Sequence, residues 1–156
     1  NVLMKLGLLP YGEFKDTLED TPALTTNLIG RHVSKMAYTK LVSNKSPWFI
    51  KADLGAVYSL PVSTIEGRFI SSKENFEKLV VNGQIASQYV DLDGKASMKE
   101  EFNPTSSMYA VESITSPDGR ILGKTSYSDR IGKGIAINIY GNQDQGIFKS
   151  GVEYFK

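Results

Sequence analysis

Few side chains in this 156-residue sequence are of the types that usually carry catalysis, and their scarcity excludes several chemistries. The chain contains no cysteine, so a thiolate nucleophile, a disulfide and a thiolate metal site are excluded within it. His32 is the single histidine, whereas a zinc site needs several nitrogen or sulfur ligands. Carboxylate-bound magnesium stays open, although no acidic cluster points to it. We interpret His32, flanked by Arg31 and Val33, as a strand residue with a local hydrogen bond, with a general base as the alternative.

Two further patterns could be mistaken for catalytic motifs. Gly132-Lys133-Gly134 is similar to part of a phosphate-binding loop, but the full Walker pattern is absent. Serines are plentiful, yet none lies in the glycine-flanked elbow that a serine hydrolase needs. Glu66 and Arg68 lie at the junction of a loop and a strand, which fits either a ligand contact or a solvated turn. These residues alone therefore identify no reaction.

Composition and charge are typical of a globular domain. Hydrophobic residues make up 40% of the chain and charged residues 22%, and 18 basic against 17 acidic side chains give a net charge of +1. This balance provides no electrostatic footprint for nucleic acid or an anionic membrane. Residues 2–9 are too short and too interrupted for a signal-peptide core, and no stretch approaches the ~20 apolar residues that span a bilayer. We therefore expect one cytoplasmic domain over residues 1–156, with no nucleic-acid or membrane partner.

The elements that must position these residues alternate between helices and strands. Residues 2–9 indicate the tail of a buried helix, and the missing N-terminal cap suggests that the chain begins within that helix. Residues 11–30 are polar and mixed, which predicts a surface connection. Trp48 and Phe49 are interpreted as a core anchor, with a contact surface for another region as the alternative. Strands are predicted over residues 31–42, 56–63, 68–70, 84–91, 109–116 and 120–125.

Local signals mark one helix and one hairpin most clearly. Ser72 precedes an apolar stripe of 3.6-residue period that ends at Gly83, which predicts a capped helix between them. Residues 116–119, Ser-Pro-Asp-Gly, predict a tight turn because proline fixes one φ and glycine supplies the positive one. A final helix is predicted over residues 143–155. Its apolar face would consist of Ile147, Phe148, Val152 and Phe155.

Eight runs, in order along nearly the whole chain, are together more specific than any one of them. The strongest is residues 114–124, Ile-Thr-Ser-Pro-Asp-Gly-Arg-Ile-Leu-Gly-Lys. The others are residues 5–10, 29–34, 42–48, 66–69, 83–91, 102–104 and 141–145. In these runs the chain resembles the glutamine amidotransferase domain of large, single-chain phosphoribosylformylglycinamidine synthases. The resemblance implies an α/β fold, a three-layer sandwich of the class I glutamine amidotransferase (flavodoxin-like) kind, here only as its C-terminal portion.

The resemblance also implies a reaction and partners. In this family a cysteine attacks the side-chain amide of glutamine, a histidine acts as general base and a glutamate orients it. The ammonia passes to a synthetase region, which uses ATP and Mg to convert formylglycinamide ribonucleotide to the amidine of purine synthesis. This chain would need no cofactor of its own. Its partners would be that synthetase region and the upstream half of the domain, or another copy, since an incomplete sheet leaves an unpaired edge.

The chain departs from the family at the positions closest to the chemistry. The family cysteine would lie upstream of Asn1, outside this sequence. Residues 126–130 replace the family's Gly-His-Ser-Glu-Arg run, so that Tyr127 stands at the histidine position and Asp129 at the glutamate position. A neutral phenol, with a reference pKa of ~10, is a poor proton acceptor at pH 7. The alternatives are therefore part of a glutaminase module, a catalytically dead remnant for structure or docking, or a repurposed small-molecule binding domain.

Four further positions are assigned to the substrate site by the same resemblance. Residues 64–69, Thr-Ile-Glu-Gly-Arg-Phe, replace the family's His-Gly-Glu-Gly-Arg-Phe. Because the family places this segment close to its active site, Glu66, Gly67 and Arg68 are predicted to bind substrate. Arg130 matches the arginine that ends the family's histidine-containing run, and it is predicted to join them.

Overall fold

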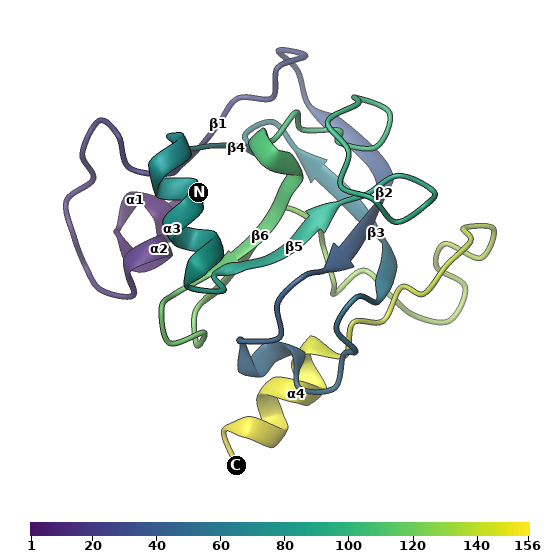
Figure 1. The fold of residues 1–156 in the computed structure, drawn as a ribbon. Coiled ribbons are helices and arrows are strands. Elements are labelled where there is room, and N and C mark those ends of the chain that lie inside the picture. The colour runs from purple at the N-terminus through teal and green to yellow at the C-terminus, as the bar shows by residue number, and fades with distance from the viewer.

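The computed structural model describes residues 1–156 throughout (Figure 1). The helices are short: α1 (Val2–Lys5), α2 (Leu8–Tyr11), α3 (Lys73–Val81) and α4 (Ile147–Tyr154), with the 3-10 turns η1 (Pro47–Phe49) and η2 (Met108–Ala110). The strands are β1 (Ala23–Thr25), β2 (Val33–Leu41), β3 (Val57–Thr64), β4 (Arg68–Ile70), β5 (Ile85–Tyr89), β6 (Val111–Thr115) and β7 (Leu122–Lys124). None of the helices has the length and apolar character to cross a membrane.

The strands form two antiparallel sheets. The larger one has the order β3-β2-β5-β6-β7, and the smaller one pairs β1 with β4. The longest pairing joins β2 to β3, in register from Val33 opposite Thr64 to Lys40 opposite Val57. Helices packed against strongly curled strands confirm the predicted mixed α/β class, and each predicted strand is present (Figure 1).

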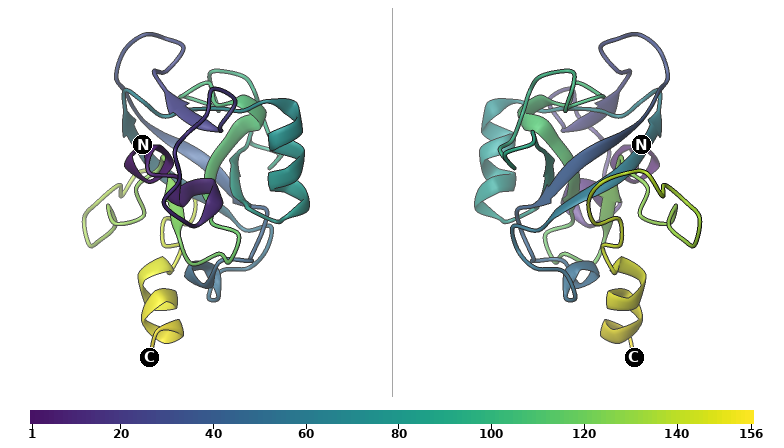
Figure 2. Two further views of the ribbon diagram at one scale, coloured as in Figure 1. Left: turned by 90° about the vertical axis from the view of Figure 1, so that its left-hand side faces the viewer. Right: turned by 90° about the vertical axis from the view of Figure 1, so that its right-hand side faces the viewer.

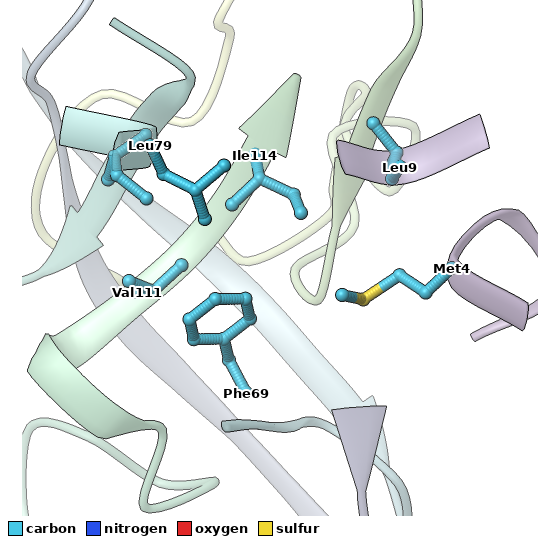
Figure 3. Packing of buried hydrophobic residues seen from close by; sticks show 7 residues of the cluster. Met4, Leu9, Phe69, Leu79, Val111 and Ile114 are labelled. Carbon is cyan, nitrogen blue, oxygen red and sulfur yellow. The ribbon is translucent and has the colours of Figure 1, made fainter. Parts of the chain in front are cut away.

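One core cluster lies between the larger sheet and the elements α1, α2, α3 and β4 (Figure 3). Phe69 from β4 lies at its centre, between Met4 of α1 and Val111 of β6. Burial of each large apolar side chain contributes ~1.5–3 kcal/mol, so this cluster holds the N-terminal helices onto the sheet. Its buried members are Met4, Leu9, Phe69, Leu79, Ile85, Val111 and Ile114.

A smaller core joins η1 and α4 to the end of the sheet. Phe49 is completely buried beside Leu41 and Ala86, and Ile147 packs partly against the same group. This burial confirms the prediction of an aromatic core anchor at Phe49. Neighbouring Trp48 is only partly buried, and its indole N–H donates to a backbone carbonyl of the β6–β7 turn at 2.7 Å.

The predicted apolar stripe of α4 mostly faces solvent. Phe148, Val152 and Phe155 are each more than half exposed, and Figure 2 shows α4 projecting from the body of the molecule. The side of α4 that packs inward carries small residues. A Cβ on Gly151 would lie 2.3 Å from Cζ3 of Trp48. Only a glycine therefore lets the helix backbone approach the indole so closely.

The N-terminal region differs from the single buried helix that its sequence predicted. Gly7 adopts a left-handed conformation with φ of 77° and separates α1 from α2. The following connection contains β1, which the sequence did not predict because its pairing partner β4 lies far along the chain. The capped helix was predicted correctly, since the Ser72 hydroxyl accepts from the Asn75 N–H at 3.2 Å. The turn between β6 and β7 is also confirmed.

The two outer edges of the larger sheet differ in their hydrogen bonding. The segment from residue 126 to 142 returns to the outer edge of β3 at both of its ends. The Tyr127 N–H donates to the Pro61 carbonyl at 2.9 Å, and the Ser59 N–H donates to the Asn142 carbonyl at 2.8 Å. On the other side β7 pairs only with β6 and ends the sheet. The unpaired edge expected from the sequence therefore corresponds to β7.

Candidate functional site

Three of the predicted residues lie together in the segment that follows β7. Tyr127 is half-buried, and its hydroxyl donates to the Ser63 carbonyl at 3.1 Å. The guanidinium carbon of Arg130 lies 3.8 Å from the centroid of the Tyr127 ring, a cation–π contact. Asp129 is exposed and makes neither a hydrogen bond nor an ion pair. The phenol is thus fixed along β3 as a hydrogen-bond donor and is not oriented by an acid.

His32 approaches the same strand end from another direction. Its Nε2 lies 3.3 Å from the Ser63 hydroxyl, whose own carbonyl accepts from Tyr127. The contact is exposed, and His32 makes no second hydrogen bond that would fix its tautomer. A catalytic serine–histidine pair requires such a third group to orient the imidazole. His32 lies just before β2 and its hydrogen bond reaches Ser63, 31 positions along the chain, so it is not the strand residue with a local hydrogen bond that the sequence predicted. The geometry of a triad is also absent.

The other predicted substrate-binding residues lie on the connection from β3 to β4. The Glu66 carboxylate accepts from the Asn1 side-chain amide at 2.5 Å. The Gly67 N–H donates to the buried side chain of Asn27 at 3.0 Å, and a Cβ on Gly67 would lie within 2.7 Å of two threonine methyl groups. Arg68 has a buried Nε without a hydrogen-bond partner. No hydrogen bond or ion pair joins this group to the segment after β7, so the structure places the predicted residues in two separate groups.

A first cavity, of about 250 Å³, lies between the helices α1 and α2 and the strands β1, β4, β6 and β7. Its walls are mainly apolar side chains from the core cluster, with Asn1 at one side. Two charged residues also reach it, Glu112 of β6 and Lys124 of β7. The apolar lining consists of Leu3, Met4, Leu9, Leu24, Phe69, Val111, Ile114 and Leu122.

Glu112 and Lys124 form a buried ion pair that the sequence did not predict. The Glu112 side chain is 0% exposed and that of Lys124 8% exposed, and the Lys124 Nζ lies 3.3 Å from the Glu112 Oε2. The other carboxylate oxygen accepts from the Ser126 N–H at 2.9 Å and from the Ser126 hydroxyl at 2.6 Å. The Ser87 hydroxyl makes a further short hydrogen bond to Oε2. A buried carboxylate with this many donors meets the condition under which a buried charge is tolerated.

The environment acts differently on the two partners of this pair. Burial is the largest single influence on Glu112 and acts to raise its pKa, but the charge of Lys124 and the hydrogen bonds from Ser126 and Ser87 together outweigh it. The pKa of Glu112 consequently lies below its ordinary value of 4.5. Burial lowers the pKa of Lys124 from its ordinary value of 10.5, and Glu112 offsets this only in part. Glu112 is therefore ionised at neutral pH.

A second cavity, of about 340 Å³, lies on the other side of Lys124. Lys124 borders both cavities, whereas Glu112 borders only the first. The second cavity brings the segment after β7 against η1 and α4. Its lining comprises Trp48, Leu122, Lys124, Ser126, Tyr127, Ser128, Asp129, Ile147 and Phe148.

The chemistry available here consists of hydrogen-bond donors and one buried cation. No three His, Cys, Asp or Glu side chains gather where they could hold a metal ion. A signal for Glu112 and Lys124 was present in the sequence, because both charges stand inside segments predicted as strands. Antiparallel pairing places Lys124 opposite Ser113, next to Glu112, but no local pattern reveals that register.

Comparison with known proteins agrees with this architecture. The sequence profile of the CobB/CobQ-like glutamine amidotransferase domain matches residues 1–155. In the solved structure described as PurLQS from Thermotoga maritima, one chain superposes with a TM-score of 0.68 at 17% sequence identity, covering 99% of this chain and 57% of that chain. At this identity the likeness shows the fold alone, and it supports the predicted class I amidotransferase-like fold.

Named relatives are also similar in sequence to much of the chain. Phosphoribosylformylglycinamidine synthase subunit PurQ of Aquifex aeolicus is 29% identical over 134 residues, covering 86% of this chain and 53% of the relative. The protein of the same name in Picrophilus torridus is 30% identical over 131 residues, covering 83% and 48%. The chain thus spans about half the length of these relatives. Because the family profile matches almost every residue, the chain belongs to the CobB/CobQ-like glutamine amidotransferase domain family.

Proposed function

We propose that this chain is part of the glutaminase module that supplies ammonia for the ATP-dependent conversion of formylglycinamide ribonucleotide to formylglycinamidine ribonucleotide, in cytoplasmic purine biosynthesis. The observation that carries the proposal is the family match over residues 1–155, together with relatives named as a subunit of that synthase. The substrate of the module would be glutamine. Glu66, Gly67, Arg68 and Arg130 remain the proposed substrate-binding residues, on the resemblance alone.

The proposal assigns ATP and Mg to another polypeptide region. The similar chain of known structure belongs to an assembly described as PurLQS, which suggests that this chain also works beside synthetase partners. The open edge of β7 and the first cavity next to it offer a surface for the upstream half of the domain. In this proposal the chain needs no cofactor of its own.

A catalytically inactive docking module is the second candidate, and it has its own supporting observation. Tyr127, at the family's histidine position, has its hydroxyl proton committed to the Ser63 carbonyl and its ring covered by Arg130. A phenol whose proton is donated in this way is not placed to act as a general base. Asp129, at the family's glutamate position, contacts no base.

Glutamine hydrolysis by the full-length chain with its synthetase partners decides between the two candidates. Glutamate release that requires an upstream cysteine, with formation of the amidine from glutamine, is expected for a glutaminase. The inactive candidate predicts amidine formation from ammonium salts but not from glutamine. A matched Tyr127→Phe variant tests the role of the hydroxyl, because it keeps the ring and its contact with Arg130. If neither nitrogen source supports amidine formation, the proposed pathway is wrong.

A further inference from the structure

Two serines flank Tyr127, and buried side chains hold both of them. Ser126 donates from its N–H and its hydroxyl to the Glu112 Oε1, at 2.9 Å and 2.6 Å. On the other side, the Ser128 hydroxyl donates to the Gln145 Oε1 at 2.6 Å. Both serines and both acceptors are buried. Tyr127 therefore lies between two anchored neighbours.

Lys124 connects these two anchors. Its Nζ donates to the Glu112 Oε2 at 3.3 Å and to the Gln145 Oε1 at 2.9 Å. Because Glu112 already balances the charge of the ammonium, Lys124 acts here as a bridge between two acceptors. Gln145 lies directly before the glycine that precedes α4, so the segment before α4 reaches back to residues 126–128 through a buried contact.

The amide of Gln145 is held in an orientation that leaves one of its atoms unpaired. The residue is 1% exposed, and its Nε2 has no hydrogen-bond partner. Because lysine can only donate, the amide oxygen must face Lys124, and the nitrogen then faces no acceptor. Buried donors without a partner are rare in folded proteins, so this one requires an explanation. The explanation that fits the contacts is that one oxygen must accept from Lys124 and Ser128 together.

We propose that Gln145 is a positioning residue of the candidate site, which acts on Tyr127 through Ser128. The contacts of Tyr127 support this role, because its N–H donates to the Pro61 carbonyl at 2.9 Å and its hydroxyl to the Ser63 carbonyl at 3.1 Å. Both bonds require the backbone after Tyr127 to stay close to β3, and the buried bond from Ser128 to Gln145 holds it there. As a role in that site, the inference rests on the proposed function.

Native-state hydrogen exchange of the full chain, followed by NMR, tests this role without requiring catalysis. Gln145→Leu keeps the buried ion pair and removes the acceptor of Ser128. We expect the Tyr127 N–H to exchange at least about fivefold faster in this variant, the factor that corresponds to one hydrogen bond, relative to the N–H of Leu60. Leu60 is completely buried in the pairing of β2 with β3, so its exchange reports opening of the whole sheet. A purely structural role of Gln145 would accelerate both amides by the same factor.

A second pair of variants tests the donor side of the same bond. Ser128→Ala removes the hydroxyl and leaves Lys124 with both of its acceptors, and we expect the same relative acceleration at Tyr127. Ser128→Thr keeps the hydroxyl, and its added methyl group can enter the second cavity, which Ser128 borders. This variant should restore wild-type exchange. If Gln145→Leu fails to fold, the two Ser128 variants still decide.

Gln143→Leu is the matched control in the same segment. The Gln143 amide donates only to backbone carbonyls of the loop before it, so this variant should leave the relative exchange of the two amides unchanged. Equal acceleration of both amides in Gln145→Leu, or wild-type exchange in Ser128→Ala, would overturn the proposal. Neither outcome depends on glutamine hydrolysis, so failure of this inference is distinguishable from failure of the proposed function.

Discussion

The carboxylate of Glu112 accepts hydrogen bonds from both the backbone N–H and the hydroxyl of Ser126. Ser126 directly precedes Tyr127, so a buried charge in β6 holds the start of the segment that contains Tyr127, Asp129 and Arg130. The same carboxylate is paired with Lys124. The position of that segment therefore depends on an ion pair in the interior of the sheet, and changes to this pair are expected to act on both stability and site geometry.

Replacing Glu112 by glutamine should destabilise the protein strongly. The variant leaves Lys124 buried without an opposite charge, and breaking a buried pair in this way costs about 3–5 kcal/mol. We expect a decrease of that size in the free energy of unfolding, measured by urea denaturation followed by circular dichroism. The double variant with Lys124→Met should recover most of the loss, because no unpaired charge remains. A double variant less stable than Glu112→Gln would contradict this explanation.

Stability should also fall in acid because of the same carboxylate. The pKa of Glu112 is lower in the folded state than its ordinary value of 4.5. A group with a lowered folded-state pKa contributes stability that is complete above its unfolded-state pKa and is lost as the pH falls through its folded-state pKa. We expect the urea midpoint to decrease below about pH 4.5 in the wild type, and less steeply in the double variant Glu112→Gln with Lys124→Met. The pKa of Asp118 is lowered mainly by a hydrogen bond from Ser116. The stability of both proteins therefore keeps a smaller dependence on pH and also falls in acid.

Substitution of Gly151 by alanine should loosen α4. The added Cβ would lie 2.3 Å from a ring carbon of Trp48, so the helix or the indole must move. Overpacking of this kind costs about 1–3 kcal/mol. We expect a red shift of the Trp48 emission and faster proteolysis near α4. Val152→Ala is the matched control on the exposed side of the same helix and should change stability by no more than about 0.5 kcal/mol. Equal effects of the two variants would show that the close approach to Trp48 is unimportant.

Removal of the Tyr127 hydroxyl should cost little. Tyr127→Phe keeps the ring and its contact with Arg130 and loses only the hydrogen bond to the Ser63 carbonyl. We expect the free energy of unfolding to decrease by about 1 kcal/mol, the usual net contribution of one such bond. Tyr127→Ala should cost more, because it also removes the stacked ring. If the two variants are equally stable, the Arg130 contact does not contribute.

Local sequence chemistry was sufficient for several elements of the fold. The Ser72 hydroxyl caps α3 as predicted, and the Ser-Pro-Asp-Gly run forms the turn between β6 and β7. Strands β2 and β3 also follow from their own patterns. In each case the determining residues lie within a few positions of one another, so their preferences are visible without the tertiary structure.

The remaining features depend on residues that are distant in the sequence. β1 is three residues long and exists because Leu24 pairs opposite Phe69, which no local pattern predicts. The apolar residues of α4 indicated a buried stripe, but the helix packs through Gly151 because the Trp48 ring occupies the space in front of it. The pairing of Glu112 with Lys124 requires the register of β6 against β7 and the curl of the sheet. Neither the register of the two strands nor the curl of the sheet can be deduced from the spacing of residues in the sequence.

Both ends of the segment after β7 are fixed to the edge of β3, at Tyr127 and at Asn142. The intervening residues are therefore a closed loop whose ends are held by the sheet. Closing a loop of twice the length costs only about 0.6 kcal/mol more. Apart from its chain neighbours, no atom lies within 4 Å of the position that a Cβ on Gly134 would occupy. For protein engineering, the position after Gly134 is thus an insertion point at which an epitope or a labelling peptide can be grafted without disturbing the strands that anchor the loop.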